Sequence, residues 1–215
     1  DDGFQHWQLY RDLDIVLVDG TNPFGNGHVL PRGILREPME QLGRADAFII
    51  TKGDQITQDR AEAIAAKLRQ YNPAAPVAMA IHKPSSCLAF AAWHDGKSDG
   101  SGVLRPDGQS VLAVSALGNP ASFERTLADA GFTVAGSLRY EDHHHYSRDD
   151  IRHMAARTAE TGCLLVTTEK DAVKLPAPLI KEYDLPLYVL SITIEFTAGQ
   201  DQIDTILQAV LEDKL

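Results

Sequence analysis

Carboxylates and histidines that could do chemistry gather in two short segments far apart in the sequence. The first is Asp1-Asp-Gly-Phe-Gln-His6, in which two adjacent carboxylates could hold Mg²⁺ directly or through water. The second is Asp142-His-His-His-Tyr146, where a carboxylate beside a histidine could fix the ring tautomer and tune its pKa towards neutrality. On the residues alone, the first segment could also be a polar turn, and the second a hydrated loop before a helix.

The histidine run leaves a further interpretation open. His143 to His145 could contribute to the zinc site of a hydrolase, because histidine and aspartate are natural zinc ligands. Adjacent side chains on an extended segment point in alternating directions, however, so three consecutive histidines rarely share one metal ion. We therefore favour acid–base work by His143 over zinc binding, with a plain polar loop as the alternative to both.

Glycines, prolines and arginines dominate the stretch from Gly20 to Gly43. It contains Phe24-Gly-Asn-Gly27, Leu30-Pro-Arg-Gly33 and Leu35-Arg-Glu-Pro38. Glycine lets a backbone approach a ligand closely, and the arginine guanidinium is a fork suited to phosphate. The stretch is either a ligand-binding loop or an ordinary surface loop. It is no dinucleotide fingerprint, because the third glycine and the strand–helix context are missing.

Two further motifs follow apolar runs that are typical of buried strands. Thr51-Lys-Gly-Asp54 is similar to the base-recognition tetrad of GTPases, which keeps a GTP-binding module open as an alternative, although a turn at a strand end explains it as well. Thr167-Thr-Glu-Lys-Asp171 predicts a charge network at the start of a helix. The sequence contains no Gly-x-x-x-x-Gly-Lys-Ser/Thr motif and therefore no phosphate-cradling loop of its own.

Alternating strands and helices must position these residues. Short apolar runs predict strands at 14–19, 47–51 and 77–81, and later at 111–116, 132–138, 164–167 and 187–196. Periodic apolar positions predict helices that begin near Thr57, Pro120, Arg148 and Asp201. Buried strands that alternate with helices indicate a parallel α/β sheet. Cys87 to Trp93 reads as a strand of a β-hairpin that turns at Asp95-Gly96 and marks a domain boundary.

Composition sets the class of protein. The chain has 215 residues, 44% hydrophobic and 23% charged, which are ordinary globular values, and a net charge of −10. This acidity argues against a nucleic-acid partner and is unfavourable for an anionic membrane, and we find no basic amphipathic helix.

Cys87 and Cys163 lie in apolar contexts and predict buried thiols. Because the chain begins at Asp1 without methionine, we expect it to be a piece of a longer protein.

The motifs, taken in order, resemble the tetraacyldisaccharide 4′-kinase family, the lipid A 4′-kinases of Gram-negative bacteria. The resemblance extends over nearly the whole chain. It rests on the segments 1–6, 13–20, 24–27, 30–38, Arg44-Ala-Asp46, Gly118-Asn-Pro120, Asp142-His-His144 and 167–175. One departure is Ile34, where the family pattern has proline; this difference affects loop stiffness more than chemistry.

The resemblance implies a fold and an activity. The fold is α/β, part of a P-loop-type parallel-sheet domain plus a smaller α/β domain, joined by a β-hairpin linker. Residues 1–84 would be the C-terminal part of the P-loop kinase domain, 85–110 the linker, 111–190 the small domain, and 191–215 a return strand and closing helix. The activity would be transfer of phosphate from ATP to the 4′-hydroxyl of tetraacyldisaccharide 1-phosphate. Because the P-loop and the catalytic-base aspartate would lie upstream, we expect the chain alone to be inactive.

The resemblance also implies roles for single residues. Asp1 and Asp2 would hold Mg²⁺; His143 would be the active-site histidine and Asp142 its orienting carboxylate. Asn26, Arg36 and Glu37 would bind the substrate near its headgroup. The cofactors would be ATP and Mg²⁺, and the partners the lipid A disaccharide precursor and, peripherally, the cytoplasmic face of the bacterial inner membrane. Neither nucleic acid nor an obligate protein partner is implied.

Overall fold

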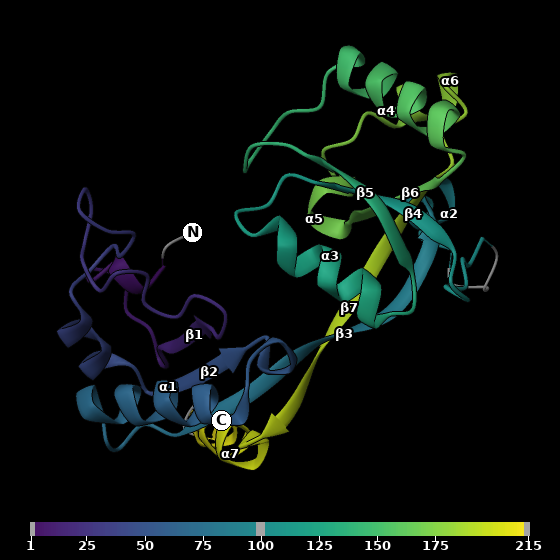
Figure 1. Cartoon of the computed structure of the whole chain (residues 1–215). Helices are drawn as coiled ribbons and strands as arrows, with labels where there is room; N and C mark the ends of the chain where they lie inside the picture. The colour runs from purple at the N-terminus through teal and green to yellow at the C-terminus, as the bar shows by residue number, and fades with distance from the viewer. Residues whose placement is uncertain (1–2, 98–101, 213–215) are drawn as a thin grey trace. The chain divides into compact units, whose positions relative to one another are not determined.

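Two compact units make up the computed structural model of the chain, which describes residues 3–97 and 102–212. One unit contains residues up to His82 together with those from Ile194 onwards, and the other contains Lys83–Thr193. The strands β3 (Val77–Ala89) and β7 (Leu187–Ala198) pass from one unit into the other (Figure 1). Each unit is described by itself below, as the first unit and the second unit.

Parallel strands form the sheet of the first unit. The strands β1 (Ile15–Asp19) and β2 (Ala47–Thr51) pair in parallel, with Val16 opposite Phe48, and β2 pairs in parallel with β3. The strand order is β1-β2-β3-β7, with β1 at the edge. The run Ala47-Phe-Ile-Ile50 is buried throughout, as a central strand covered on both faces requires. The parallel α/β class predicted from the sequence is confirmed.

A helix covers each face of this sheet. The helix α1 (Gln58–Tyr71) begins after Thr57, whose hydroxyl accepts a hydrogen bond from the Arg60 backbone N–H at 3.3 Å. Its apolar residues pack with the β2 side chains Phe48 and Ile50. The helix α7 (Gln200–Glu212) packs through Ile203 against the opposite face. The short 3₁₀ helix η1 (Gly3–Gln5) precedes β1, η2 (Met39–Arg44) lies between β1 and β2, and η3 (Gly53–Gln55) follows β2.

The strands of the second unit belong to the same seven-stranded sheet, which continues in parallel in the order β7-β6-β4-β5. Its strands are β4 (Ser110–Ser115), β5 (Thr133–Arg139) and β6 (Leu164–Thr168), besides β7. The helix α3 (Pro120–Asp129) packs on one face through Phe123 and Leu127, and α4 (Arg148–Thr161) packs on the other through Ile151 and Met154. The short helices α5 (Glu169–Ala172) and α6 (Ala177–Glu182) follow β6.

The order in which the chain adds strands reverses within this part of the sheet. From β4 the chain moves outward to β5, and then returns through α4 to β6 on the other side of β4. In open parallel sheets, ligands bind beyond the carboxyl ends of the strands at such a reversal. The loops after β4, β5 and β6 are therefore the part of this unit where chemistry is expected.

The predicted β-hairpin strand at Cys87 to Trp93 is wrong in its second half. Strand β3 ends at Ala89, and Phe90–His94 form the short helix α2. In a strand, Phe90 and Trp93 would point to opposite faces, whereas one helical turn places both rings together, 6.3 Å apart, against the core. The returning chain pairs with the end of β3 by a single antiparallel bridge between Leu88 and Val103. The sequence also predicts a flexible tip at 98–102, of which residues 98–101 lie outside the described residues.

Burial predicts how strongly single side chains of the first unit stabilise it. Ile50 in β2 is 2% exposed, whereas Leu17 in the edge strand β1 is 66% exposed. We expect Ile50→Ala to lower the free energy of unfolding by about 2–5 kcal/mol, because it leaves a cavity in the core. The matched Leu17→Ala variant should change it by about 0.5 kcal/mol or less. Urea unfolding of both variants measures the difference, and equal effects would contradict this packing.

Candidate functional site

Asp142 and His143 lie in the loop that follows β5. His143 adopts a left-handed backbone conformation, with φ of 64°, which is uncommon for a residue other than glycine. Its backbone N–H donates a hydrogen bond to Asp142 Oδ1 at 3.0 Å. Its ring Nε2 lies 3.9 Å from Asp142 Oδ2, which suits an ion pair with a protonated ring but is too long for a hydrogen bond. The side chain is 80% exposed, so the ring is free to meet a substrate.

Lys170 joins this loop from the next strand end. Its Nζ lies 3.0 Å from Asp142 Oδ1. The two residues meet because β5 and β6 are parallel strands of one sheet, so their carboxyl ends share an edge. The hydrogen bond from Lys170 lowers the pKa of Asp142; slight burial opposes this, and the charges of Lys170 and His143 add to it. Asp142 therefore stays ionised beside the His143 ring.

His144 has a structural role rather than a chemical one in this arrangement. Its ring stacks on Tyr140 with centroids 4.8 Å apart and meets Tyr146 edge-on at 5.3 Å. Its Nε2 lies 3.0 Å from Asp150 Oδ2, and Asp150 also completes the capping box of α4 with Ser147. The histidine run is thus divided between a packed His144 and an exposed His143. Among the residues that the structure describes, no three potential ligands are grouped around one metal position.

The sequence motif predicted that Asp171 takes part in a helix-start network, but it did not predict that the side chain is buried. The predicted helix-start network exists, since Thr168 caps α5 and accepts from the Asp171 backbone N–H at 3.1 Å. The Asp171 side chain, however, is fully buried. Its Oδ2 accepts from the Ala116 backbone N–H at 3.1 Å and from the Thr168 hydroxyl at 2.9 Å. One buried carboxylate therefore joins the loops that follow β4 and β6.

Other buried polar atoms surround the second oxygen of Asp171. Asp171 Oδ1, Lys174 Nζ and the Tyr146 hydroxyl are buried, and none has a hydrogen-bond partner in the structure. Lys174 Nζ lies 3.9 Å from Asp171 Oδ1 and balances its charge. Burial, followed by the charge of Asp171, raises the pKa of Tyr146. Such atoms in native proteins are normally joined by an ordered water, so this cluster is a polar anchor beneath the His143 loop.

Arg36 and Glu37 line a cavity in the first unit. The cavity has a volume of about 610 Å³, and its walls are mostly apolar side chains from β1, the Pro23–Phe24 turn and η2. Glu37 accepts a hydrogen bond from the Trp7 indole N–H at 2.8 Å and pairs with the Arg44 guanidinium. Arg36 is exposed. A polar headgroup with an apolar tail would match this combination of lining residues.

Asn26 holds the neighbouring loop in shape. Its amide donates to the Arg32 carbonyl at 2.8 Å, and its Oδ1 accepts from the His28 backbone N–H at 3.2 Å. Gly33 packs so closely that an added Cβ would lie 2.1 Å from Asn26 Oδ1. The structure thus gives Asn26 a scaffolding contact, and its expected contact with substrate stays a prediction.

The GTPase-like motif Thr51–Asp54 is joined to the end of strand β1 by an ion pair. Lys52, in a left-handed conformation with φ of 58°, places its Nζ 2.6 Å from Asp19 Oδ2. Burial raises the pKa of Asp19, but hydrogen bonds from Lys52 and Thr21 outweigh it, and the pKa lies below its usual value. This pair connects the carboxyl ends of β1 and β2, which is the turn-forming role that the motif also allowed.

Two of the sequence-predicted site residues cannot be placed. Asp1 and Asp2 lie outside the described residues. Within the described ranges, no helix combines the length and apolar content that crossing a bilayer requires.

The Lys170–Asp142 pair predicts a pH effect. We expect Lys170→Met to raise the pKa of Asp142 towards the ordinary value of about 3.9, because the main hydrogen bond that lowers it is lost. A lowered pKa contributes stability above the unfolded-state value and loses it as the pH falls through the folded-state value. The variant should therefore lose less stability in acid. NMR titration of the Asp142 carboxyl measures the shift; the exposed Lys181→Met is the control, and an unchanged Asp142 pKa would contradict the pairing.

The Asp171 anchor predicts a stability effect. Asp171→Asn should lower the free energy of unfolding by about 3–5 kcal/mol, since it leaves the buried Lys174 ammonium without its partner. Asp149→Asn, an exposed acid in the first turn of α4, should cost about 1 kcal/mol or less. Denaturant unfolding compares the two variants. A loss for Asp171→Asn as small as that of Asp149→Asn would remove the anchor from this account.

The sequence is similar to a family of enzymes and to several of its members. It matches the family described as tetraacyldisaccharide-1-P 4′-kinase (LpxK) over residues 1–212. The tetraacyldisaccharide 4′-kinase of Halothermothrix orenii is 40% identical, over 94% of this chain and 54% of the relative. That of Anaeromyxobacter sp. strain K is 39% identical, over 98% of this chain and 54% of the relative. The chain thus spans about half the length of the curated relatives it matches.

A solved structure agrees with the fold. The crystal structure of LpxK from Aquifex aeolicus in complex with ATP is similar with a TM-score of 0.59 and 24% sequence identity. The similarity covers 98% of this chain and 56% of that one. It supports the mixed α/β architecture with a mostly parallel sheet. The family match over residues 1–212, together with the relatives at 40% and 39% identity, shows that the chain belongs to the tetraacyldisaccharide 4′-kinase family.

Proposed function

We propose that this chain is part of an ATP-dependent kinase that transfers the γ-phosphoryl group of ATP to the 4′-hydroxyl of a tetraacyldisaccharide 1-phosphate in lipid A biosynthesis. Family membership over residues 1–212 supports the reaction. The structural observation that carries the proposal is the group formed by Lys170, Asp142 and His143 at the carboxyl ends of β5 and β6. A fixed carboxylate beside an exposed imidazole is an arrangement suited to proton transfer.

His143 acts as the acid–base partner in this proposal. It partners the catalytic-base aspartate that takes the proton of the sugar hydroxyl, and the ionised Asp142, 3.9 Å from its ring Nε2, orients the imidazole. Lys170 keeps Asp142 ionised, so the carboxylate stays an acceptor and does not take the proton itself. Phosphoryl transfer depends mainly on positioning and charge neutralisation, so His143 assists the base and does not replace it.

Arg36, Glu37 and Asn26 form the substrate side of the proposal. The Arg36 guanidinium suits a phosphate or sugar oxygen of the headgroup, and the adjoining cavity offers apolar walls. Glu37 is fixed by Trp7 and Arg44, so its carboxylate has a set position at the cavity. Asn26 shapes the loop that carries them, besides its proposed contact with substrate.

Mg²⁺ and ATP complete the chemistry. Asp1 and Asp2 supply adjacent carboxylates, the oxygen ligands that Mg²⁺ prefers, so the donor set fits this ion. Bound Mg²⁺ neutralises charge on the phosphate oxygens. The sequence carries no P-loop motif, and we place the nucleotide cradle and the catalytic-base aspartate in the part of the family's length that this chain does not span. The chain alone is then inactive.

The proposed setting is the cytoplasmic face of the bacterial inner membrane, where a lipid substrate is reached peripherally. We propose neither a nucleic-acid nor an obligate protein partner. Residues 1–84 belong to the kinase domain in this proposal, 85–110 form the linker, 111–190 the small domain, and 191–215 the returning strand and closing helix.

The proposal predicts the effect of removing the imidazole. In the full-length enzyme, His143→Ala should lower kcat by about 10²- to 10⁴-fold, the range of a lost acid–base group. His153→Ala removes another exposed histidine of the second unit, on α4, and should leave kcat unchanged. Phosphate transfer from Mg-ATP to the disaccharide measures both. Wild-type turnover by His143→Ala would take the residue out of the mechanism. Stoichiometric zinc or a preference for GTP would favour the two rival functions.

A further inference from the structure

We propose that the loop of residues 28–36 docks the protein onto an anionic lipid bilayer. We call this segment, His28-Val-Leu-Pro-Arg-Gly-Ile-Leu-Arg36, the docking loop. The inference deepens the proposed function, and it rests on that function only for the expectation that the substrate comes from a membrane. It names the surface that meets the lipid.

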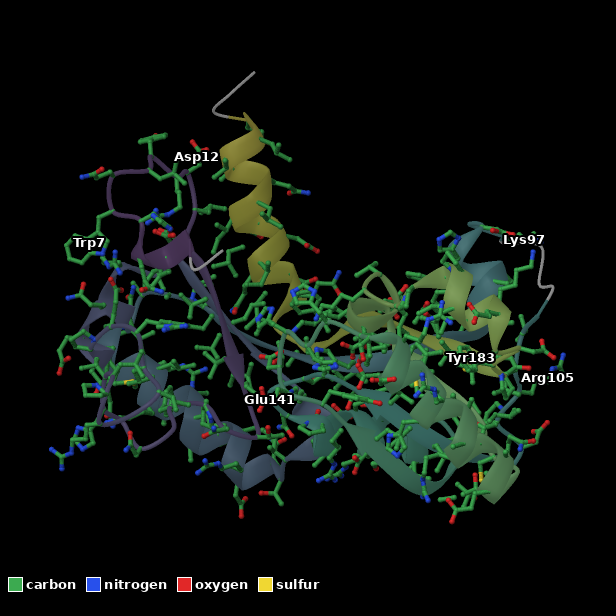
Figure 2. All side chains as sticks on the ribbon, turned by 90° about the horizontal axis from the view of Figure 1, so that it is seen from above. Trp7, Asp12, Lys97, Arg105, Glu141 and Tyr183 are labelled. Atoms are coloured by element: carbon green, nitrogen blue, oxygen red, sulfur yellow. The ribbon has the colours of Figure 1, made fainter. Side chains whose placement is uncertain are left out.

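Apolar side chains of the docking loop point into solvent. Leu30 is 53% and Ile34 60% exposed, and Val29 is also exposed. Single exposed apolar residues are ordinary, but three within six positions form a local cluster. Trp7 is also largely exposed (Figure 2). Its hydrogen bond to Glu37 joins it to the residue after the loop. Tryptophan is enriched at membrane–water interfaces.

The docking loop is held in shape by its own hydrogen bonds. The Leu30 N–H donates to the Leu35 carbonyl at 3.0 Å, and the Gly33 N–H donates to the Val29 carbonyl at 3.0 Å. The Leu35 N–H donates to the His28 carbonyl at 3.2 Å, and Asn26 fixes the tip through Arg32. The backbone polar groups are thus used internally while Leu30 and Ile34 stay outside. A loop built in this way presents its apolar side chains in a fixed arrangement.

The charge of the loop complements an anionic surface. The chain as a whole carries a net charge of −10, yet no acidic residue occurs between Asp19 and Glu37, whereas Arg32 and Arg36 lie within this interval. Both arginines are exposed. Basic residues beside inserted apolar side chains are the combination that binds anionic headgroups. The Arg44 guanidinium pairs with Glu37, so the nearest acid is already balanced.

The position of the loop suits delivery of a lipid. Leu35 and Arg36 belong to the docking loop and also line the cavity of about 610 Å³. Docking through Leu30 and Ile34 would therefore place the bilayer beside the proposed substrate residues. Another exposed apolar surface of the first unit, Leu207 and Leu211 on α7, has acidic neighbours such as Asp204 and Glu212 and would be repelled by an anionic surface.

Vesicle flotation tests the docking loop without any turnover. The protein is mixed with phosphatidylcholine vesicles that contain phosphatidylglycerol, and separately with pure phosphatidylcholine vesicles, in the absence of ATP and disaccharide. We expect binding to the anionic vesicles, weaker binding at high salt and little binding to the neutral ones. A blue shift of tryptophan emission on binding should be lost in Trp7→Phe.

Paired variants locate the contact. Leu30→Ser with Ile34→Ser should lower the bound-to-free ratio by roughly tenfold or more, because two apolar side chains no longer insert. Arg32→Gln should weaken binding to anionic vesicles only. Leu207→Ser with Leu211→Ser is the matched control and should bind as the unchanged protein does. All of these residues are exposed, and circular dichroism checks that each variant is folded.

Several results would overturn the inference. They are the absence of binding to anionic vesicles, equal binding by the Leu30/Ile34 double variant, or loss of binding in the α7 control. Failure of the proposed function would look different, since a protein that binds vesicles through this loop but transfers no phosphate keeps the docking inference and loses the kinase.

Discussion

The buried carboxylate of Asp171 is the interaction on which the geometry of the second unit depends. It accepts from the Ala116 backbone N–H and from the Thr168 hydroxyl, and so joins the ends of two strands that meet where the strand order reverses. Its charge is balanced by Lys174 at 3.9 Å. A buried charge of this kind is costly unless it is paired, which makes the arrangement of the loops above it specific.

In the loop after β5, two adjacent histidines have different surroundings. His144 is held by Tyr140, Tyr146 and Asp150, whereas His143 stays exposed next to an Asp142 that Lys170 keeps ionised. The first unit uses the same device at its own sheet edge, where the Asp19–Lys52 pair fixes the start of the long loop that carries the docking loop. In both units, ion pairs at the carboxyl ends of parallel strands leave neighbouring side chains available for ligands.

Local patterns were enough to predict most of the elements, because buried parallel strands are continuous apolar runs and helices show a period near 3.6 residues. They failed at Phe90 and Trp93, where packing against a distant core selects a helical turn over an extended strand. The burial of Asp171 could not be predicted, since it depends on Ala116, which is 55 positions away in the sequence. The net charge of −10 also gave no indication of the basic docking loop, because a sum over the whole chain does not show that residues 20–36 contain two arginines and no acidic residue. The roles predicted for Asp1 and Asp2 stay predictions.

The account's central claim is that this chain belongs to an enzyme that phosphorylates the 4′-hydroxyl of a lipid disaccharide. Its most direct test is to incubate the full-length protein with Mg-ATP and tetraacyldisaccharide 1-phosphate and to locate the new phosphate by ³¹P NMR. The account predicts a phosphomonoester at the 4′ position, formed in equal amount with ADP. Release of ADP without a 4′ ester, or a phosphate found at another hydroxyl, would contradict it.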